Sequence, residues 1–245
     1  MEATGYIIRV TPYQEANAIV NLLTANGLVT FSARGILKIN AKNASAIQPF
    51  HYVKVDLAEG KMATARYSLK NAELLCGVEK IINNLTAMSA LFTIGEIVNK
   101  LFVNDEEISE IYPYFAAAIK TILNGFDPFT AILLFLAASL KVAGYGLEVN
   151  QCVNCGSKKN IKGFSVEEGG LLCETCLLEQ GGKSLSPRMI NIVRYIFLFP
   201  AEKFAHTSFA ESENSLLISQ LLIYLNDMLN VKINSYNDFL KVSKV

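Results

Sequence analysis

The sequence predicts an α+β protein in which a small N-terminal β-barrel is followed by a larger helical domain. Up to about residue 80, apolar and polar side chains alternate with the period of β-strands. From about Val78 onward, apolar residues instead recur at helical spacing, and two pairs of cysteines interrupt the helical pattern. We therefore expect a barrel domain over residues 1–80 and a helical domain over residues 81–245, with a cysteine-bearing insert at about 148–183.

The first domain is expected to contain five short strands. They cover residues 5–10, 18–23, 28–32, 52–57 and 62–69. Asn26-Gly27 lies between the second and third of these strands and is a strong hairpin signal. Five antiparallel strands within eighty residues fit a closed barrel, and the OB-fold is the commonest five-stranded one. An SH3-like barrel remains an alternative, because periodicity does not separate the two.

The second domain is expected to contain five main helices. They cover residues 85–102, 113–123, 128–143, 189–199 and 215–229. The third and fourth are preceded by Asp127-Pro128 and Ser186-Pro187, in which a capping side chain is followed by proline at the first helical position. The third helix is the most apolar of the five, which predicts burial.

The cysteines predict a metal site. Cys152 and Cys155 form one C-x-x-C pair, and Cys173 and Cys176 form a second pair about seventeen residues later. Two such knuckles can bring four thiolates around one tetrahedral ion, so we expect a zinc ribbon with one structural Zn²⁺. Two disulfides or a redox C-x-x-C are the alternatives. Cys76 stands apart from these pairs and is expected to be a small buried apolar residue.

Composition indicates a well-buried globular protein. Of 245 residues, 51% are hydrophobic and 18% are charged, and the 22 basic side chains balance the 22 acidic ones. The longest apolar run covers residues 129–140 and is shorter than the roughly 20 residues of a membrane span, which predicts a core helix and no membrane association. No signal peptide is visible at the N-terminus, so we expect a cytoplasmic, nucleoid-associated location.

Basic residues are concentrated in the first domain. Residues 16–72 hold seven basic and two acidic side chains, and no acidic residue occurs between Ala16 and Val55. Such a surface suits nucleic-acid phosphates, because binding releases condensed counterions. The alternative is an ordinary solvated face. The candidate contacts are Arg34, Lys38, Lys42, Lys54, Arg66 and Lys70.

Aromatic side chains near these basic residues are candidates for stacking on bases. They are Phe31, Phe50, Tyr52 and Tyr67. The alternative is that they are core residues of the barrel.

No motif of an enzyme is present. The chain has no phosphate-binding G-x-x-x-x-G-K-[ST] loop, no G-x-S-x-G elbow and no H-E-x-x-H pair. We therefore expect a protein without catalytic activity. A rival hypothesis is an interaction scaffold, in which the apolar helices over residues 129–140 and 216–229 bind a partner peptide.

Several short fragments, in their order along the chain, resemble the RecO recombination-mediator family. They are Thr4–Ile8, Tyr13–Asn17, Leu23-Thr24 with Gly27, Ala33–Lys38, Gln48–Phe50, Gly144-Tyr145, the two cysteine pairs with Gly156 and Gly169-Gly170, and Ser184–Ser186. Together they span residues 4 to 186. It is the order of the whole set along the chain that carries the resemblance.

The resemblance implies an N-terminal OB-fold that binds single- and double-stranded DNA and anneals complementary strands. It also implies partnership with RecR and with the single-strand-binding protein during loading of the strand-exchange recombinase. Arg34, Lys38 and Lys42 fall in the family's basic stretch, which here holds fewer basic residues than family members usually show. This leaves Lys158, Lys159 and Lys162 on the ribbon as further candidates for DNA contact.

Overall fold

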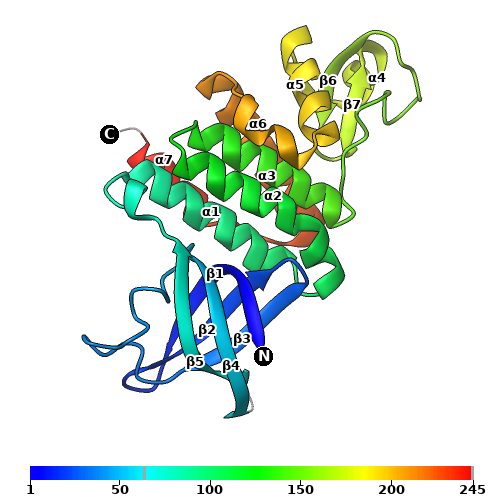
Figure 1. Ribbon diagram of the computed structural model, residues 1–245. Helices are drawn as coiled ribbons and strands as arrows, with labels where there is room; N and C mark the ends of the chain where they lie inside the picture. The colour runs from blue at the N-terminus through cyan, green and yellow to red at the C-terminus, as the bar shows by residue number, and fades with distance from the viewer. Residues whose placement is uncertain (63–64, 244–245) are drawn as a thin grey trace.

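The computed structural model describes residues 1–62 and 65–243 and begins with a closed five-stranded barrel (Figure 1). The strands are β1 (Glu2–Tyr13), β2 (Asn17–Thr24), β3 (Gly27–Ala33), β4 (Tyr52–Met62) and β5 (Ala65–Cys76). Their order around the barrel is β1-β2-β3-β5-β4, with β1 paired to both β2 and β4. Among the described barrel strands, β3 and β5 pair in parallel, whereas the sequence had predicted antiparallel strands throughout. This Greek-key closure confirms the predicted OB-type barrel.

The barrel core is formed by the inward-facing residue of each strand. Ile7, Leu22, Phe31, Val53 and Val55 are fully buried together inside it. Three strands run well beyond the prediction, since β1 continues through Pro12, β4 continues to Met62 and β5 continues to Cys76. The β4–β5 ladder contains several bulges, and each bulge shifts the alternation on which the prediction relied.

Cys76 was expected to be buried, and this expectation was wrong. It lies exposed at the end of β5, where the strand leaves the barrel. A free cysteine behaves as a small apolar residue only where surrounding side chains cover it, and nothing in its sequence position decides that.

A helical body follows the barrel and is built around α3 (Pro128–Val142). Every residue from Phe129 to Leu140 is buried, as the apolar sequence predicted. The other helices are α1 (Leu85–Leu101), α2 (Asp105–Leu123), α5 (Pro187–Leu198), α6 (Glu211–Leu229) and α7 (Ser235–Val242), with short 3₁₀ turns η1 (Glu79–Ile81) and η2 (Ala201–His206). None of the helices in the described ranges is long and apolar enough to span a bilayer.

Helix starts follow the capping side chains. Asp127 accepts hydrogen bonds from the N–H groups of Phe129 and Thr130 at the start of α3, and Ser186 caps α5 in the same way, as predicted. The predicted start of α2 at Pro113 was wrong. That helix begins eight residues earlier, because the Asn104 side chain caps it and acidic residues occupy its first turn.

The cysteine-bearing insert lies between α3 and α5, at the end of the molecule away from the barrel (Figure 1). It contains β6 (Ile161–Ser165), β7 (Gly170–Cys173), the short helix α4 (Glu174–Gln180) and β8 (Lys183–Ser184), with the sheet order β7-β6-β8. The helix α4 was not predicted, since its seven residues are too few to show a periodic pattern.

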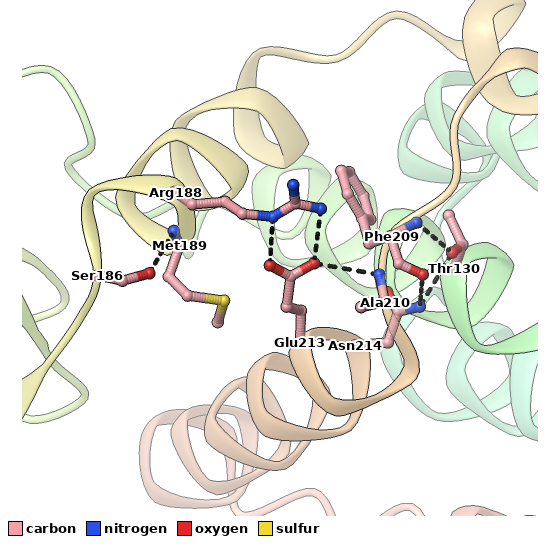
Figure 2. Close-up of polar contacts among 8 residues, drawn as sticks. All are labelled: Thr130, Ser186, Arg188, Met189, Phe209, Ala210, Glu213 and Asn214. Atoms are coloured by element: carbon pink, nitrogen blue, oxygen red, sulfur yellow. Dashed lines mark hydrogen bonds and ion pairs between the residues drawn. The ribbon is translucent and has the colours of Figure 1, made fainter.

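The start of α6 is tied to the starts of α3 and α5 by polar contacts (Figure 2). Asn214 is fully buried and donates to Thr130 Oγ1 at 3.0 Å and to the carbonyl of Phe209 at 3.3 Å. One residue earlier, Glu213 accepts hydrogen bonds from the guanidinium of Arg188 and from the N–H of Ala210. The buried amide Nδ2 of Asn214 thus favours one arrangement of α3 and α6, whereas the pair of Glu213 with the exposed Arg188 is a weaker link to α5.

The barrel is attached to the helical body through its outer surface. Tyr6, Ile8, Leu23 and Phe50 point away from the barrel core and are buried in the apolar cluster that contains α1, α2 and α3. Tyr6 packs edge-on against Phe115 of α2, with ring centroids 5.6 Å apart. One side of the barrel is therefore covered by the body.

Phe50 and Gly95 fit together at this junction. Phe50 adopts a positive φ of 66°, which is costly for an aromatic residue, and its ring packs edge-on against Phe92 of α1. Gly95 lies one turn further along α1, and a Cβ atom at this position would lie 2.9 Å from Phe50 Cε1. The absent side chain of Gly95 is what lets the ring approach the helix.

Replacing Gly95 by alanine should therefore destabilise the protein, although the same change inside a helix normally stabilises by roughly 1 kcal/mol. Overpacking against the fixed ring should cost about 1–3 kcal/mol and reverse the sign. Urea unfolding measures the difference. In a Phe50→Leu background the substitution should become neutral or stabilising. A stabilising effect in the otherwise unchanged protein would show that the ring is not held against α1.

Candidate metal centre and nucleic-acid interface

The four paired cysteines converge on one point. The Sγ atoms of Cys152, Cys155, Cys173 and Cys176 all lie within 4.8 Å of one another, and those of Cys155 and Cys173 are 3.7 Å apart. Four sulfurs around a tetrahedral ion at about 2.3 Å would be separated by about 3.8 Å, which matches this spacing. A disulfide requires about 2.05 Å, and all of these cysteines are free. The residues present fit a metal ion.

Backbone hydrogen bonds hold the two cysteine pairs against each other. The N–H of Val153 in the first knuckle donates to the carbonyl of Leu171 on β7, at 2.9 Å. The N–H of Glu174 in the second knuckle donates back to the carbonyl of Asn160, also at 2.9 Å. Gly156 closes the first knuckle with a φ of +73°, which favours glycine. The cluster is thus positioned by the backbone of the insert.

The thiols of this cluster do not titrate alike. Burial on its own would raise the pKa of Cys152, but the backbone N–H groups of Cys155, Cys173 and Asn154 point at its sulfur and lower that pKa to about 6. Burial and the neighbouring thiols raise the pKa of Cys176 to about 12. Crowded thiols oppose full ionisation, so a tetrathiolate needs a cation at its centre, and metal binding must release protons.

Four of the six basic residues singled out in the sequence lie where β3 ends, in the loop that follows it and on the adjoining strand β5. The buried Ser32 pairs in parallel with Ser68, so the end of β3 lies beside β5. Arg34 follows the last residue of β3, and Lys70 lies two residues beyond Ser68 on β5. The side chain of Lys38 lies over Gly35. Lys42 precedes Asn43, whose Oδ1 accepts a hydrogen bond from the N–H of Ala72 on β5. Arg34, Lys38, Lys42 and Lys70, all exposed, are called the basic cluster below.

The remaining two basic candidates lie elsewhere. Arg66 is exposed on β5, four residues from Lys70 and therefore about 13 Å along the strand. Lys54 on β4 forms an ion pair of 2.8 Å with Glu2, and the carboxylates of Glu2, Asp56 and Glu73 raise its pKa. Lys54 is therefore part of a mixed-charge surface and does not belong to the basic cluster.

Most of the aromatic residues proposed for base stacking are used in packing. Phe31 is fully buried in the barrel core and Phe50 in the junction with the body. Tyr52 stacks at a tilt on Tyr6, with ring centroids 4.7 Å apart, at the same junction. Tyr52 and Tyr67 are both half-buried, but only Tyr67 of these four lies outside both the core and the junction, with the Arg66 guanidinium 5.6 Å from its ring centroid.

Two exposed side chains near the basic cluster were not singled out in the sequence. Tyr13 is 38% exposed at the end of β1, opposite Asn17, which accepts a hydrogen bond from the N–H of Gly35. Ile39 lies in the loop between β3 and β4 and is 99% exposed. A signal for Ile39 was available, because an isoleucine between Lys38 and Asn40 in a polar loop has no strand to pack on.

Comparison with known proteins places the chain among recombination proteins. The family model for the N-terminal part of recombination protein O matches residues 1–78, and the model for its C-terminal part matches residues 82–236. The chain therefore belongs to the RecO family, whose members act in DNA repair and recombination.

Curated relatives support this assignment over most of the chain. The DNA repair protein RecO of Bacillus subtilis is 23% identical over 225 residues, which cover 91% of this chain and 87% of that protein. The DNA repair protein RecO of Bacillus pumilus is 27% identical over 81% of this chain and 77% of its own length. That of Exiguobacterium sibiricum is 29% identical over 70% of this chain and 68% of its own length.

Cys173→Ser should abolish stoichiometric metal binding and lower the melting temperature, because metal-binding free energy is in part folding free energy. Each kcal/mol lost should shift the midpoint by roughly 2–4 °C in a chain of this size. Metal analysis and thermal unfolding of reduced protein measure both effects. An excess of chelator should reproduce the shift in the parent protein and add nothing in the variant.

Cys76→Ser is the matched control, since this exposed thiol lies outside the cluster. It should leave metal content and melting temperature unchanged. Reduced, freshly purified protein that carries no metal would contradict the assignment of the cluster as a metal site.

Proposed function

We propose that this protein binds single- and double-stranded DNA through the basic cluster on its barrel and anneals complementary strands without covalent chemistry. The observation that carries the proposal is the set of four exposed basic residues, Arg34, Lys38, Lys42 and Lys70, at the end of β3, in the loop that follows it and on the adjoining β5. None of these four residues forms an ion pair among the residues that the structure describes. Their charge therefore remains available for phosphates. Membership of the RecO family supports the same ligand.

The physical steps of annealing need only such a surface. Two complementary strands repel each other, and cations fixed on a protein reduce this repulsion while releasing condensed counterions. Strands held by their phosphates leave their bases free to find a partner. No nucleophile, general base or open metal position is required for these steps, which agrees with a mediator that has no catalytic activity.

We infer that the ion in the cysteine cluster is Zn²⁺ and that its role is structural. Four cysteine ligands leave no open position for substrate, and soft thiolates select zinc over harder cations. The insert lies at the end of the molecule away from the barrel, so the ion would stabilise the insert without touching DNA that is bound at the basic cluster (Figure 1).

The proposal extends to domains and partners. We propose a barrel domain over residues 1–80 and a helical domain over 81–245, with the ribbon at about 148–183, and the limits of the two family models support this division. We further propose that RecR and the single-strand-binding protein are the partners during recombinase loading, as family membership suggests. The rival idea of a peptide-binding scaffold loses one of its two segments, because residues 129–140 are buried within the body, whereas Ile223 and Met228 in residues 216–229 are exposed.

Replacing Arg34, Lys38 and Lys42 together by glutamine should weaken DNA binding and flatten its salt dependence. Each lost phosphate contact should reduce the slope of log affinity against log salt concentration by roughly 1. A salt titration of binding to a fluorescent oligonucleotide measures the slope, and annealing of complementary strands measures the consequence.

Lys54→Gln is the control, because Lys54 is already paired with Glu2. It should leave the slope nearly unchanged. If the parent protein bound DNA with little salt dependence, or if the triple variant annealed strands as fast as the parent, DNA binding by the basic cluster would be refuted.

A further inference from the structure

The loop between β3 and β4 presents one isoleucine to solvent. Ile39 is 99% exposed, whereas Ile36 and Ile47 on either side of it are buried in the barrel core. The two buried residues anchor the loop, and the segment between them projects outward. A large apolar side chain left fully in water adds nothing to the stability of the folded chain. Ile39 differs from other exposed apolar residues, such as Leu178 on α4, in lying between Lys38 and Lys42.

Successive turns hold the loop in place. The N–H of Lys38 donates to the carbonyl of Gly35 at 3.2 Å, and the N–H of Ala41 donates to the carbonyl of Lys38 at 3.1 Å. The second of these bonds puts Ile39 at the corner of a four-residue turn, from residue 38 to residue 41. Farther along, the Oδ1 atom of Asn43 holds the loop to β5. Ile39 is therefore held at an exposed position by a hydrogen-bonded turn.

The surroundings of this turn indicate what could cover Ile39. Lys38 precedes it, Lys42 follows three residues later, and Arg34 lies at the start of the loop. No acidic residue occurs in the sequence between Ala16 and Val55. A ligand that buries the apolar tip must therefore carry negative charge beside an apolar face. A single strand of nucleic acid has both, since its phosphates alternate with unpaired bases whose faces are apolar.

We propose that Ile39 packs against the base faces of a bound single strand, while Lys38 and Lys42 hold its phosphates. This inference rests on the proposed function and deepens it by naming a residue that touches bases. An apolar side chain placed between bases unstacks them locally, as wedge residues of other nucleic-acid-binding proteins do. Such unstacking would present bases for pairing with a second strand, which is what annealing requires.

Ile39→Ala should weaken binding to single-stranded DNA roughly tenfold, because it removes most of the apolar surface that the bases would cover. The salt slope should stay as in the parent protein, since no phosphate contact is lost. Lys38→Gln should do the opposite and reduce the slope by roughly 1. Leu178→Ala on α4 is the matched control, because Leu178 is also highly exposed, at 82%, but lies on the ribbon. It should change neither quantity.

A direct readout is available because the chain contains no tryptophan. The tryptophan introduced by Ile39→Trp would be the single indole fluorophore, and an oligothymidine strand should quench it by stacking. The tryptophan introduced by Leu178→Trp should keep its fluorescence on addition of the same strand. Both sites are exposed, and unchanged thermal unfolding of each variant would show that the fold is intact.

The outcomes separate this inference from the proposed function. If the parent protein binds DNA with a steep salt slope, yet Ile39→Ala binds equally well and the introduced tryptophan is not quenched, the base contact is overturned and the proposed function stands. If the parent protein does not bind DNA, both are overturned. If phosphatidylglycerol vesicles, and not DNA, change the fluorescence of the introduced tryptophan, the tip contacts lipid and the inference is likewise overturned.

Discussion

The burial of one side of the barrel against the helical body is the constraint on which the rest of the molecule depends. Tyr6, Ile8, Leu23 and Phe50 are outside the barrel core but have almost no exposed surface, because α1 and α2 cover them. Covering apolar groups of this size contributes roughly 1.5–3 kcal/mol for each fully buried side chain. The barrel is therefore fixed to the body on that side, and the basic residues of β5 and of the loop after β3 remain exposed.

The other end of the body is organised by different means. The insert between α3 and α5 has a small apolar centre that includes three of its own cysteines, so a metal ion would contribute what a larger core contributes elsewhere. Polar contacts of Glu213 and Asn214 with the starts of α5 and α3 then fix the adjoining helices. The barrel and the insert thus lie on opposite sides of α3 (Figure 1). A substitution in one of them therefore does not change a residue that packs against the other.

Much of this arrangement was visible in the sequence. Three features that depend on local chemistry were predicted correctly. They are the burial of α3, the helix caps at Asp127 and Ser186, and the clustering of the four paired cysteines. The start of α2 was predicted wrongly because the Asn104 cap begins the helix before its periodic pattern is visible. The extent of β5 was predicted wrongly because bulges in the β4–β5 ladder interrupt the alternation of apolar residues. Which side of the barrel faces the body also escaped the prediction. Yet the unbroken run Tyr6-Ile7-Ile8 indicated it, since a strand that is apolar on both faces is covered on both.

The most direct test is amide hydrogen exchange, read by mass spectrometry, with and without a saturating single-stranded oligonucleotide. The account predicts slower exchange with DNA in residues 34–47 and 65–72, where the basic cluster and the loop after β3 lie, and no change in α5 or the cysteine-bearing insert. Protection of the insert or of α5, with none in the loop after β3, would contradict it.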